Sequence, residues 1–159
     1  MDGFETGNTA TPEGDFFANG TVSDDMPLDD YVEPDVIRDK APHELTVAQV
    51  TIKVVESKGT QKEIVDFLMR PEDTGLMNVK LVKYSLWLPH SADTPEQRNV
   101  AKGRMIKVQK ALNMSPAKTL SEFKDRIVGE ATGAKIKAVL KVRHSDEYGD
   151  SNEVERLLV

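Results

Sequence analysis

The chain has 159 residues, no cysteine and a formal net charge of −6, which leaves room for one domain of about 100–150 residues and an extension. Without cysteine there is no disulfide framework, no thiol nucleophile and no cysteine-based zinc site. No apolar run approaches the length of a membrane span, and the first residues, with Asp2 and Glu5, do not form a secretory signal. We therefore expect a soluble, intracellular protein.

Charge is distributed unevenly along the chain. Residues 1–40 hold eleven acidic residues against two basic ones, a net charge of −9, whereas residues 41–159 hold nineteen basic residues against sixteen acidic ones, a net charge of +3. The first forty residues are also too poor in apolar side chains to offset the entropy of ordering them. We predict a disordered acidic arm over 1–40 and a folded domain over 41–159. A mildly basic domain behind an acidic arm is typical of a nucleic-acid surface with an interaction or autoinhibitory tail.

The folded domain is predicted to begin with a hairpin. Apolar residues, most of them β-branched, recur at strand spacing over residues 45–54, and their alternation slips by one residue between Val47 and Val50, as a β-bulge requires. A Lys-Gly turn follows, and residues 63–70 read as the returning strand, which places Phe67 in the core.

A third strand is predicted over residues 78–88, and Pro89 ends it. Trp87, the only tryptophan of the chain, has two interpretations: a core side chain, or an exposed platform on which a base stacks. The register decides between them, because a shift of one residue reverses the faces of a strand. The alternation assigns one face to Val82, Tyr84, Leu86 and Leu88 and the other face to Lys83, Ser85 and Trp87.

Two helices are predicted after this strand. Thr94 caps the first helix, with Pro95 at its first position and Gln97 three residues after the cap. Thr119 caps the second helix, which we expect to end at Gly129. The side chains that helical spacing predicts to be buried are Val100, Ala101, Met105, Val108, Leu112, Leu120, Phe123 and Ile127.

The segment 134–143 alternates apolar and basic residues with a period of two, the pattern of a strand with one core-facing side. Its outer side is predicted to be a basic row that only Val139 interrupts. Such a row suits a polyanion bound along a sheet, although charged edge strands also deter aggregation. A turn over 145–152 and a last strand over 153–159 complete the chain. The basic row consists of Lys135, Lys137, Lys141 and Arg143.

Three strands, two helices and two strands, in that order, favour a mainly β fold of the α+β class. The arrangement predicted is a five-stranded OB-fold-like barrel with a helical insertion between its third and fourth strands. A five-stranded sandwich or another α+β sheet stays open, because the number of strands does not fix their order. No nucleophile–base pair, metal cluster or cofactor loop is recognisable, so we predict a protein that is not an enzyme and has no metal or cofactor.

The end of the chain carries a distinctive block. Ile127-Val-Gly129 ends a helix, a basic strand follows, and then come a Glu-Tyr-Gly-Asp turn and the Asn-Glu-Val residues 152–154. Through this block, residues 43–159 resemble a family of phage-encoded OB-fold single-stranded DNA-binding proteins of replication and recombination. The resemblance implies a protein of the infected host cytoplasm that binds single-stranded DNA, or RNA as an alternative, with little sequence preference. It implies no membrane partner, and homo-oligomers stay open.

The candidate nucleic-acid contacts combine cations with aromatic rings. Lys and Arg would bind phosphates, and Trp87 would stack on a base. Tyr148, at the tip of the last turn, is a second aromatic candidate, unless it only covers the hairpin. The predicted set is Lys83, Trp87, Lys135, Lys137, Lys141, Arg143 and Tyr148.

One motif stands in the acidic arm. Residues 23–28, Ser-Asp-Asp-Met-Pro-Leu, are similar to the acidic, apolar-Pro-apolar tip through which bacterial single-stranded DNA-binding proteins recruit replication partners, although that tip is C-terminal. The arm could instead be a solvated tail, or could occupy its own basic face as a DNA mimic. The second interpretation of the whole chain is a viral structural or protein-interaction module that docks through this arm. The candidate partner-binding residues are Asp24, Asp25, Met26, Pro27 and Leu28.

Overall fold

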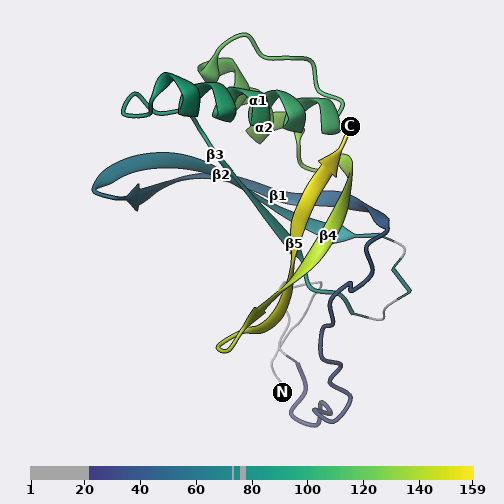
Figure 1. Cartoon of the computed structure of the whole chain (residues 1–159). Coiled ribbons are helices and arrows are strands. Elements are labelled where there is room, and N and C mark those ends of the chain that lie inside the picture. Colours follow the sequence, from purple (N-terminus) through teal and green to yellow (C-terminus); the bar gives the residue numbers. More distant parts are fainter. Residues whose placement is uncertain (1–21, 73, 76–77) are drawn as a thin grey trace. The chain divides into compact units, whose positions relative to one another are not determined.

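The computed structural model describes residues 22–72, 74–75 and 78–159. The chain divides into two compact units, Met1–Val32 and Glu33–Val159. All helices and strands of the described residues belong to the second unit, the body (Figure 1). In chain order they are β1 (Pro42–Ser57), β2 (Thr60–Pro71), β3 (Val82–Trp87), α1 (Pro95–Ala111), α2 (Leu120–Glu130), β4 (Lys135–Ser145) and β5 (Gly149–Leu158).

The five strands form one sheet that closes into a ring in the order β1-β2-β3-β5-β4. Four of the five pairings are antiparallel, and β4 pairs back to β1 to complete the ring. The fifth pairing, between β3 and β5, is parallel and consists of one residue pair, Lys83 with Glu153. The ring is therefore least tightly joined between β3 and β5. The predicted class, mainly β with two helices, is confirmed.

A β-bulge lies where the sequence predicts one. The register between β1 and β2 shifts between Val47 and Gln49, so that Val47 and Val50 both face the core. A second shift, which the sequence pattern did not indicate, lies between β4 and β5 at Val139/Leu140. Bulges increase the local twist of a strand, and twist is what a five-stranded sheet needs in order to close.

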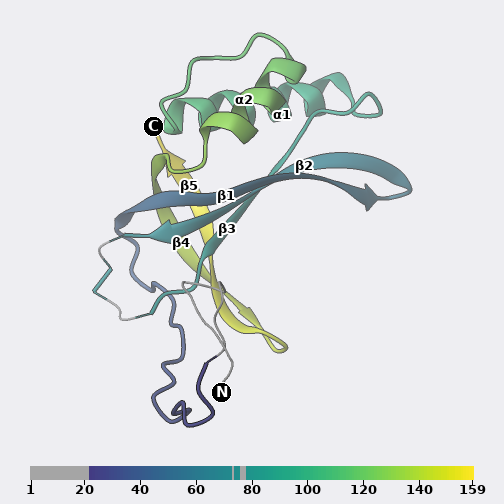
Figure 2. The ribbon, with the colours of Figure 1, turned by 180° about the vertical axis from the view of Figure 1, so that it is seen from behind.

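The two helices lie together on one side of the ring (Figures 1 and 2). Thr94 and Gln97 form the predicted capping box of α1, with both reciprocal hydrogen bonds present. α1 packs against β3 and β5, and α2 packs against β1. α2 continues one residue past the predicted end, because Gly129 keeps helical geometry and Ala131 caps the helix by donating its N–H to the carbonyl of Ile127.

The core fills the ring and the space between the ring and the helices. Phe67 is buried as predicted, and so are the predicted core residues of both helices except Val100 and Leu120. Val100 is 53% exposed, so its assignment to the buried face was wrong. Each fully buried large apolar side chain contributes about 1.5–3 kcal/mol. The largest of them are Phe123, Leu45, Met69, Leu86, Ile127 and Leu140.

The body begins at Glu33, earlier than the boundary at 41 that the composition predicts. Val36 and Ile37 are buried, and the side chain of Asn152 binds the backbone of Ile37 in both directions: its Oδ1 accepts the Ile37 N–H at 2.8 Å and its Nδ2 donates to the Ile37 carbonyl at 2.8 Å. Asn152 itself is buried within β5. The residues just before β1 are therefore part of the folded body.

Two predicted boundaries change as well. The last strand begins at Gly149, so the predicted turn over 145–152 is shorter than expected and Asn152 lies in the sheet. The third strand is also shorter, at Val82–Trp87, and upstream of it Val79 forms an isolated bridge with Asp35. None of the helices in the described residues is long and apolar enough to cross a membrane.

Candidate nucleic-acid interface

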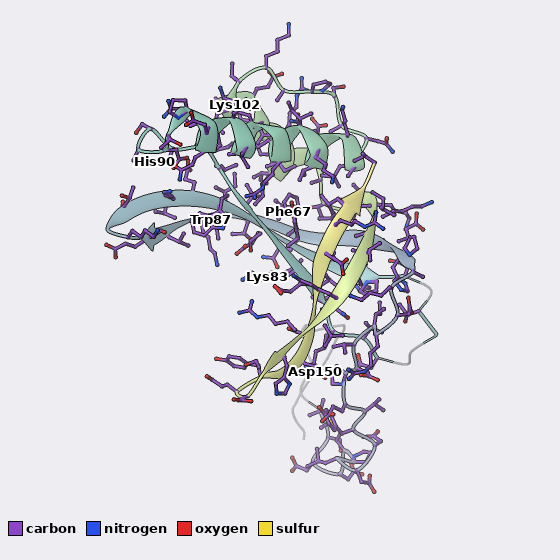
Figure 3. The ribbon with its side chains drawn as sticks, in the orientation of Figure 1. Phe67, Lys83, Trp87, His90, Lys102 and Asp150 are labelled. Carbon is purple, nitrogen blue, oxygen red and sulfur yellow. The ribbon has the colours of Figure 1, made fainter. Side chains whose placement is uncertain are left out.

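Trp87 lies on the outer side of the sheet, opposite the core. β3 directs Val82 and Leu86 inward and Lys83, Ser85 and Trp87 outward, as the alternation predicts. The Trp87 side chain is 41% exposed and lies beside Ile64 of β2, which in turn pairs with Lys53 of β1. Trp87 is thus not a core side chain. Figure 3 shows it on the same strand as Lys83, with Phe67 on the neighbouring strand β2.

The strand register aligns outward-facing residues from several strands into one row. Lys141 of β4 pairs with Glu153 of β5, Glu153 pairs with Lys83 of β3, and Lys83 pairs with Leu68 of β2. Residues directly opposite one another in a sheet point to the same side, so Lys83 and Lys141 flank Glu153. Arg143, two residues along β4, reaches the same carboxylate, with its Nη1 3.5 Å from Oε1. Three of the predicted cations are therefore gathered where β3 meets β5.

A groove of about 560 Å³ follows this junction. Its lining includes Lys83, Tyr84, Ser85, Arg143 and Glu153, from strands that the weak β3–β5 pairing leaves partly apart. Two of its cations carry a carboxylate partner that a phosphate could replace.

Asp66 sits at the centre of the outer face and fixes two lysines. Its Oδ2 lies 2.8 Å from the Nζ of Lys53 and 3.7 Å from that of Lys83, and its Oδ1 accepts a hydrogen bond from Ser85. Burial raises the pKa of Asp66, but the hydrogen bonds from Lys53 and Ser85 and the charge of Lys83 outweigh it, so the pKa lies below its ordinary value. Asp66 therefore stays ionised at neutral pH and orders the cations beside Trp87.

A cleft of about 390 Å³ lies next to Trp87, between β3 and the first half of α1. Trp87 and Val100 contribute its apolar surface, and Lys62 and Arg104 contribute cations. Lys62 is paired with Asp93 at 3.0 Å, whereas Arg104 has no ion pair among the described residues. The exposure of Val100 follows from this position, because its side chain faces the cleft and not the core.

The β4–β5 hairpin carries Tyr148 at its tip, 77% exposed. Its backbone N–H donates to the Ser145 hydroxyl at 3.2 Å, and the tyrosine ring makes no ring contact among the described residues. At the base of this turn the imidazole of His144 lies 2.8 Å from Asp150, which also binds Arg38 at 3.1 Å. The hydrogen bond and charge of Asp150 raise the pKa of His144. Tyr148 is thus presented to solvent on a braced hairpin.

The predicted basic row does not form one patch. Lys135 and Lys137 lie where β4 pairs with the start of β1, opposite Thr46 and Glu44, and the Lys135 Nζ binds the Thr46 hydroxyl at 3.1 Å. They line a separate hollow together with Lys110 of α1. Lys141 and Arg143 lie beyond Val139; Arg143 lines the groove between β3 and β5, and Lys141 lies opposite Glu153. From Lys137 to Lys141 the strand rises about 13 Å. The two halves of the basic row therefore lie at two different sites.

Sequence reasoning missed Lys53 and the basic side of α1. Lys53 is the polar residue between Ile52 and Val54, and the register after the bulge at Val47 directs it outward. α1 holds five basic residues against one acidic residue, a count that could have been read directly from residues 95–111. Its weak amphipathic pattern drew attention to the apolar positions instead.

The five candidate residues of the arm are described separately, within the unit Met1–Val32. Asp24 and Asp25 occupy a turn closed by the Met26 N–H, which donates to the Ser23 carbonyl at 3.1 Å. Met26 is 47% exposed and Leu28 is 77% exposed. The segment presents two apolar side chains among carboxylates.

No group of His, Asp or Glu able to hold a metal ion occurs in the part of the chain that the structure describes. A scan against protein-family models finds no match to this chain, and a search of curated proteins finds none either.

Proposed function

We propose that this chain is a non-catalytic, phage-type single-stranded DNA-binding protein of a replication or recombination module, built on an OB-fold. The strand order β1-β2-β3-β5-β4 and the helices between β3 and β4 support this fold, because a five-stranded Greek-key barrel has such a connectivity. OB-folds bind oligonucleotides on the face of strands two and three, between the loops that follow strands one and four. In this chain that face carries Trp87 and Lys83 of β3, and Lys53 of the neighbouring β1 lies beside it.

The observation that carries the proposal is the exposure of Trp87 among cations. A large aromatic side chain is usually buried, since burying it contributes more than any other single contact. Here the ring stays 41% exposed on the outer face, while Phe67 and Leu86 occupy the core behind it. A half-exposed indole beside lysines is the arrangement that stacks a base and neutralises its phosphate.

Binding would proceed by exchange of ion-pair partners. A phosphate entering the groove takes the place of Glu153 beside Arg143, or of Asp66 beside Lys83, so that cations already held in position need little reordering. Stacking on Trp87 then contributes about 1–3 kcal/mol for one base. Because every base has a π face and phosphates are identical, such a site has little sequence preference.

The test is a fluorescence titration of the full chain, in which Trp87 is the only tryptophan. We expect oligothymidine to quench its emission at low salt, and duplex DNA of equal length to quench it less. Each phosphate contact on a single strand contributes about 0.7 to the slope of log affinity against log salt. The variant Lys141→Ala/Arg143→Ala should therefore lower the slope by about 1.4.

The matched control removes two lysines that lie elsewhere, Lys102→Ala/Lys118→Ala, at the hollow between α1 and α2. It should leave the slope unchanged. Absence of any binding to oligothymidine at low salt would sink the proposal.

A second candidate function is favoured by the exposure of Met26 and Leu28 in the arm: docking of a partner protein. Deletion of residues 1–32 removes eight acidic residues and no basic one, and keeps Ile37 with the body. If the arm competes with DNA, the deletion should tighten binding to oligothymidine at low salt. If it only recruits a partner, DNA affinity should stay the same while replacement of Met26 and Leu28 by Ser abolishes capture of a replication protein.

A further inference from the structure

α1 carries a surplus of positive charge, most of which forms no hydrogen bond or ion pair with the described residues. Its five basic residues face one acidic residue, Glu96. Arg98 is held by the backbone carbonyls of Ser91 and Asp93. The other four cations have no hydrogen bond or ion pair to any described residue, and they are Lys102, Arg104, Lys107 and Lys110.

Two of these cations, Arg104 and Lys107, lie on one stripe of the helix surface. Val100, Arg104, Lys107 and Ala111 follow one another at spacings of four, three and four residues, so they lie along one line of the helix surface. Lys110 lies beside the end of that line. Lys102 falls on the opposite flank, where it lines the hollow against α2 together with Lys118.

The stripe connects two sites that the sheet keeps apart. At one end Val100 and Arg104 line the cleft that also contains Trp87. At the other end Lys110 and Ala111 line the hollow that contains Lys135 and Lys137. Arg104 is also close enough to β3 for its charge to oppose the rise that burial causes in the pKa of Tyr84. From Arg104 to Lys110 the helix rises about 9 Å at 1.5 Å per residue.

We propose that a bound single strand, after passing Trp87, continues along this stripe of α1 to Lys135 and Lys137. This inference rests on the proposed function and deepens it, because it makes α1 part of the binding path and lengthens the site. The occupant is a phosphate backbone, since the stripe offers cations that have no ion pair among the described residues, and its exposed apolar side chains are aliphatic, Val100 on the line and Ile106 beside Lys110. Such a path would also let both halves of the basic row on β4 contact the same strand.

The path makes a prediction about strand length. A short oligonucleotide, such as a hexamer of thymidine, fits on the sheet between Tyr148 and Trp87 and does not need α1. A twenty-nucleotide strand reaches the stripe and gains phosphate contacts there. Its salt slope should exceed that of the hexamer, and the contacts to Lys107 and Lys110 account for about 1.4 of the difference at 0.7 per contact.

The test compares the variant Lys107→Gln/Lys110→Gln with the unaltered full chain on both lengths. We expect the variant to lose about 1.4 of salt slope and roughly ten-fold in affinity at low salt on the twenty-mer, with no change on the hexamer. The control Lys102→Gln/Lys118→Gln removes the same charge from the other flank of α1 and from the loop that precedes α2. It should match the unaltered protein on both lengths.

Two outcomes overturn the inference. If the stripe variant binds both lengths as the unaltered protein does, α1 is not on the path. If it weakens both lengths equally, or no more than the control does, the helix acts only through its long-range field. Failure of the unaltered protein to bind either length would instead refute the proposed function. Circular dichroism of each variant excludes loss of fold as the cause.

Discussion

The outer face around Trp87 and the exposed side of α1 are both rich in cations. Among the described residues, the cations of the sheet face form ion pairs with carboxylates, and those of the α1 stripe do not. On the sheet, Asp66 holds Lys53 and Lys83, and Glu153 holds Arg143. On α1, Arg104, Lys107 and Lys110 have no partner among the described residues. Paired cations are ordered in advance and partly neutralised, whereas unpaired cations keep their full charge for a ligand. The sheet is thus suited to placing a strand and the helix to attracting it.

The largest expected effect comes from Trp87, because the sheet face has an exposed aromatic ring and the stripe on α1 has none. Trp87→Ala should weaken binding of oligothymidine by about 1–3 kcal/mol, because stacking of one base is lost. Trp87→Phe should recover part of this loss, since a smaller ring still stacks. Binding is measured by anisotropy of a labelled strand, because both variants lack the tryptophan signal. Equal affinity of Trp87→Ala and the unaltered chain would move the stacking site elsewhere, with Tyr148 the next ring to replace.

A stability measurement distinguishes paired from unpaired cations directly. Lys53→Gln/Lys83→Gln leaves the buried carboxylate of Asp66 without its ion pairs and should lower the free energy of unfolding by about 1–3 kcal/mol in urea melts. Lys107→Gln/Lys110→Gln should change it by no more than about 0.5 kcal/mol.

Adding Asp66→Asn to the first pair of substitutions should restore part of the loss, because no buried charge then remains. A sheet variant as stable as the helix variant would contradict the distinction between the two regions.

Asp66 by itself should affect binding less. Asp66→Asn removes a negative charge that competes with phosphate for Lys53 and Lys83, so affinity for a single strand should rise about three-fold at low salt. The gain should fade as salt is raised, because screening weakens the competition it removes. Weaker binding by this variant would mean that ordering the lysines matters more than neutralising them.

The smallest effect concerns the pH dependence of the β4–β5 hairpin. The hydrogen bond and charge of Asp150, and then Asp146, raise the pKa of His144 above its usual 6.5. Because the folded-state pKa exceeds the unfolded one, the stabilisation is fully present below about pH 6.5 and is lost as the pH rises through the folded pKa. An NMR titration of the His144 ring should show the raised pKa. Asp150→Asn should lower it more than Asp146→Asn, and equal effects would contradict the bracing role of Asp150.

Local signals predicted much of the fold from the sequence. The slip between Val47 and Val50 located the bulge, Thr94 and Gln97 located the start of α1, and the alternation in β3 put Trp87 on the same face as Lys83 and Ser85, while its burial stayed open. Each of these depends on neighbours within a few residues. The start of the body could not be predicted from the sequence, because Ile37 is held by Asn152, 115 positions away, and the composition around Ile37 resembles the acidic arm.

The candidate site divides in the same way. Which side chains share one side of a strand was determined by the sequence, because alternation along a strand is a local property of the backbone. Which of them meet was decided only by the tertiary structure. The ring brings Lys83, Lys141 and Arg143 together around Glu153 and takes Lys135 and Lys137 to α1, since strand order and register depend on packing the whole core. The one basic row of the sequence therefore lies at two sites in the structure, and α1 connects them.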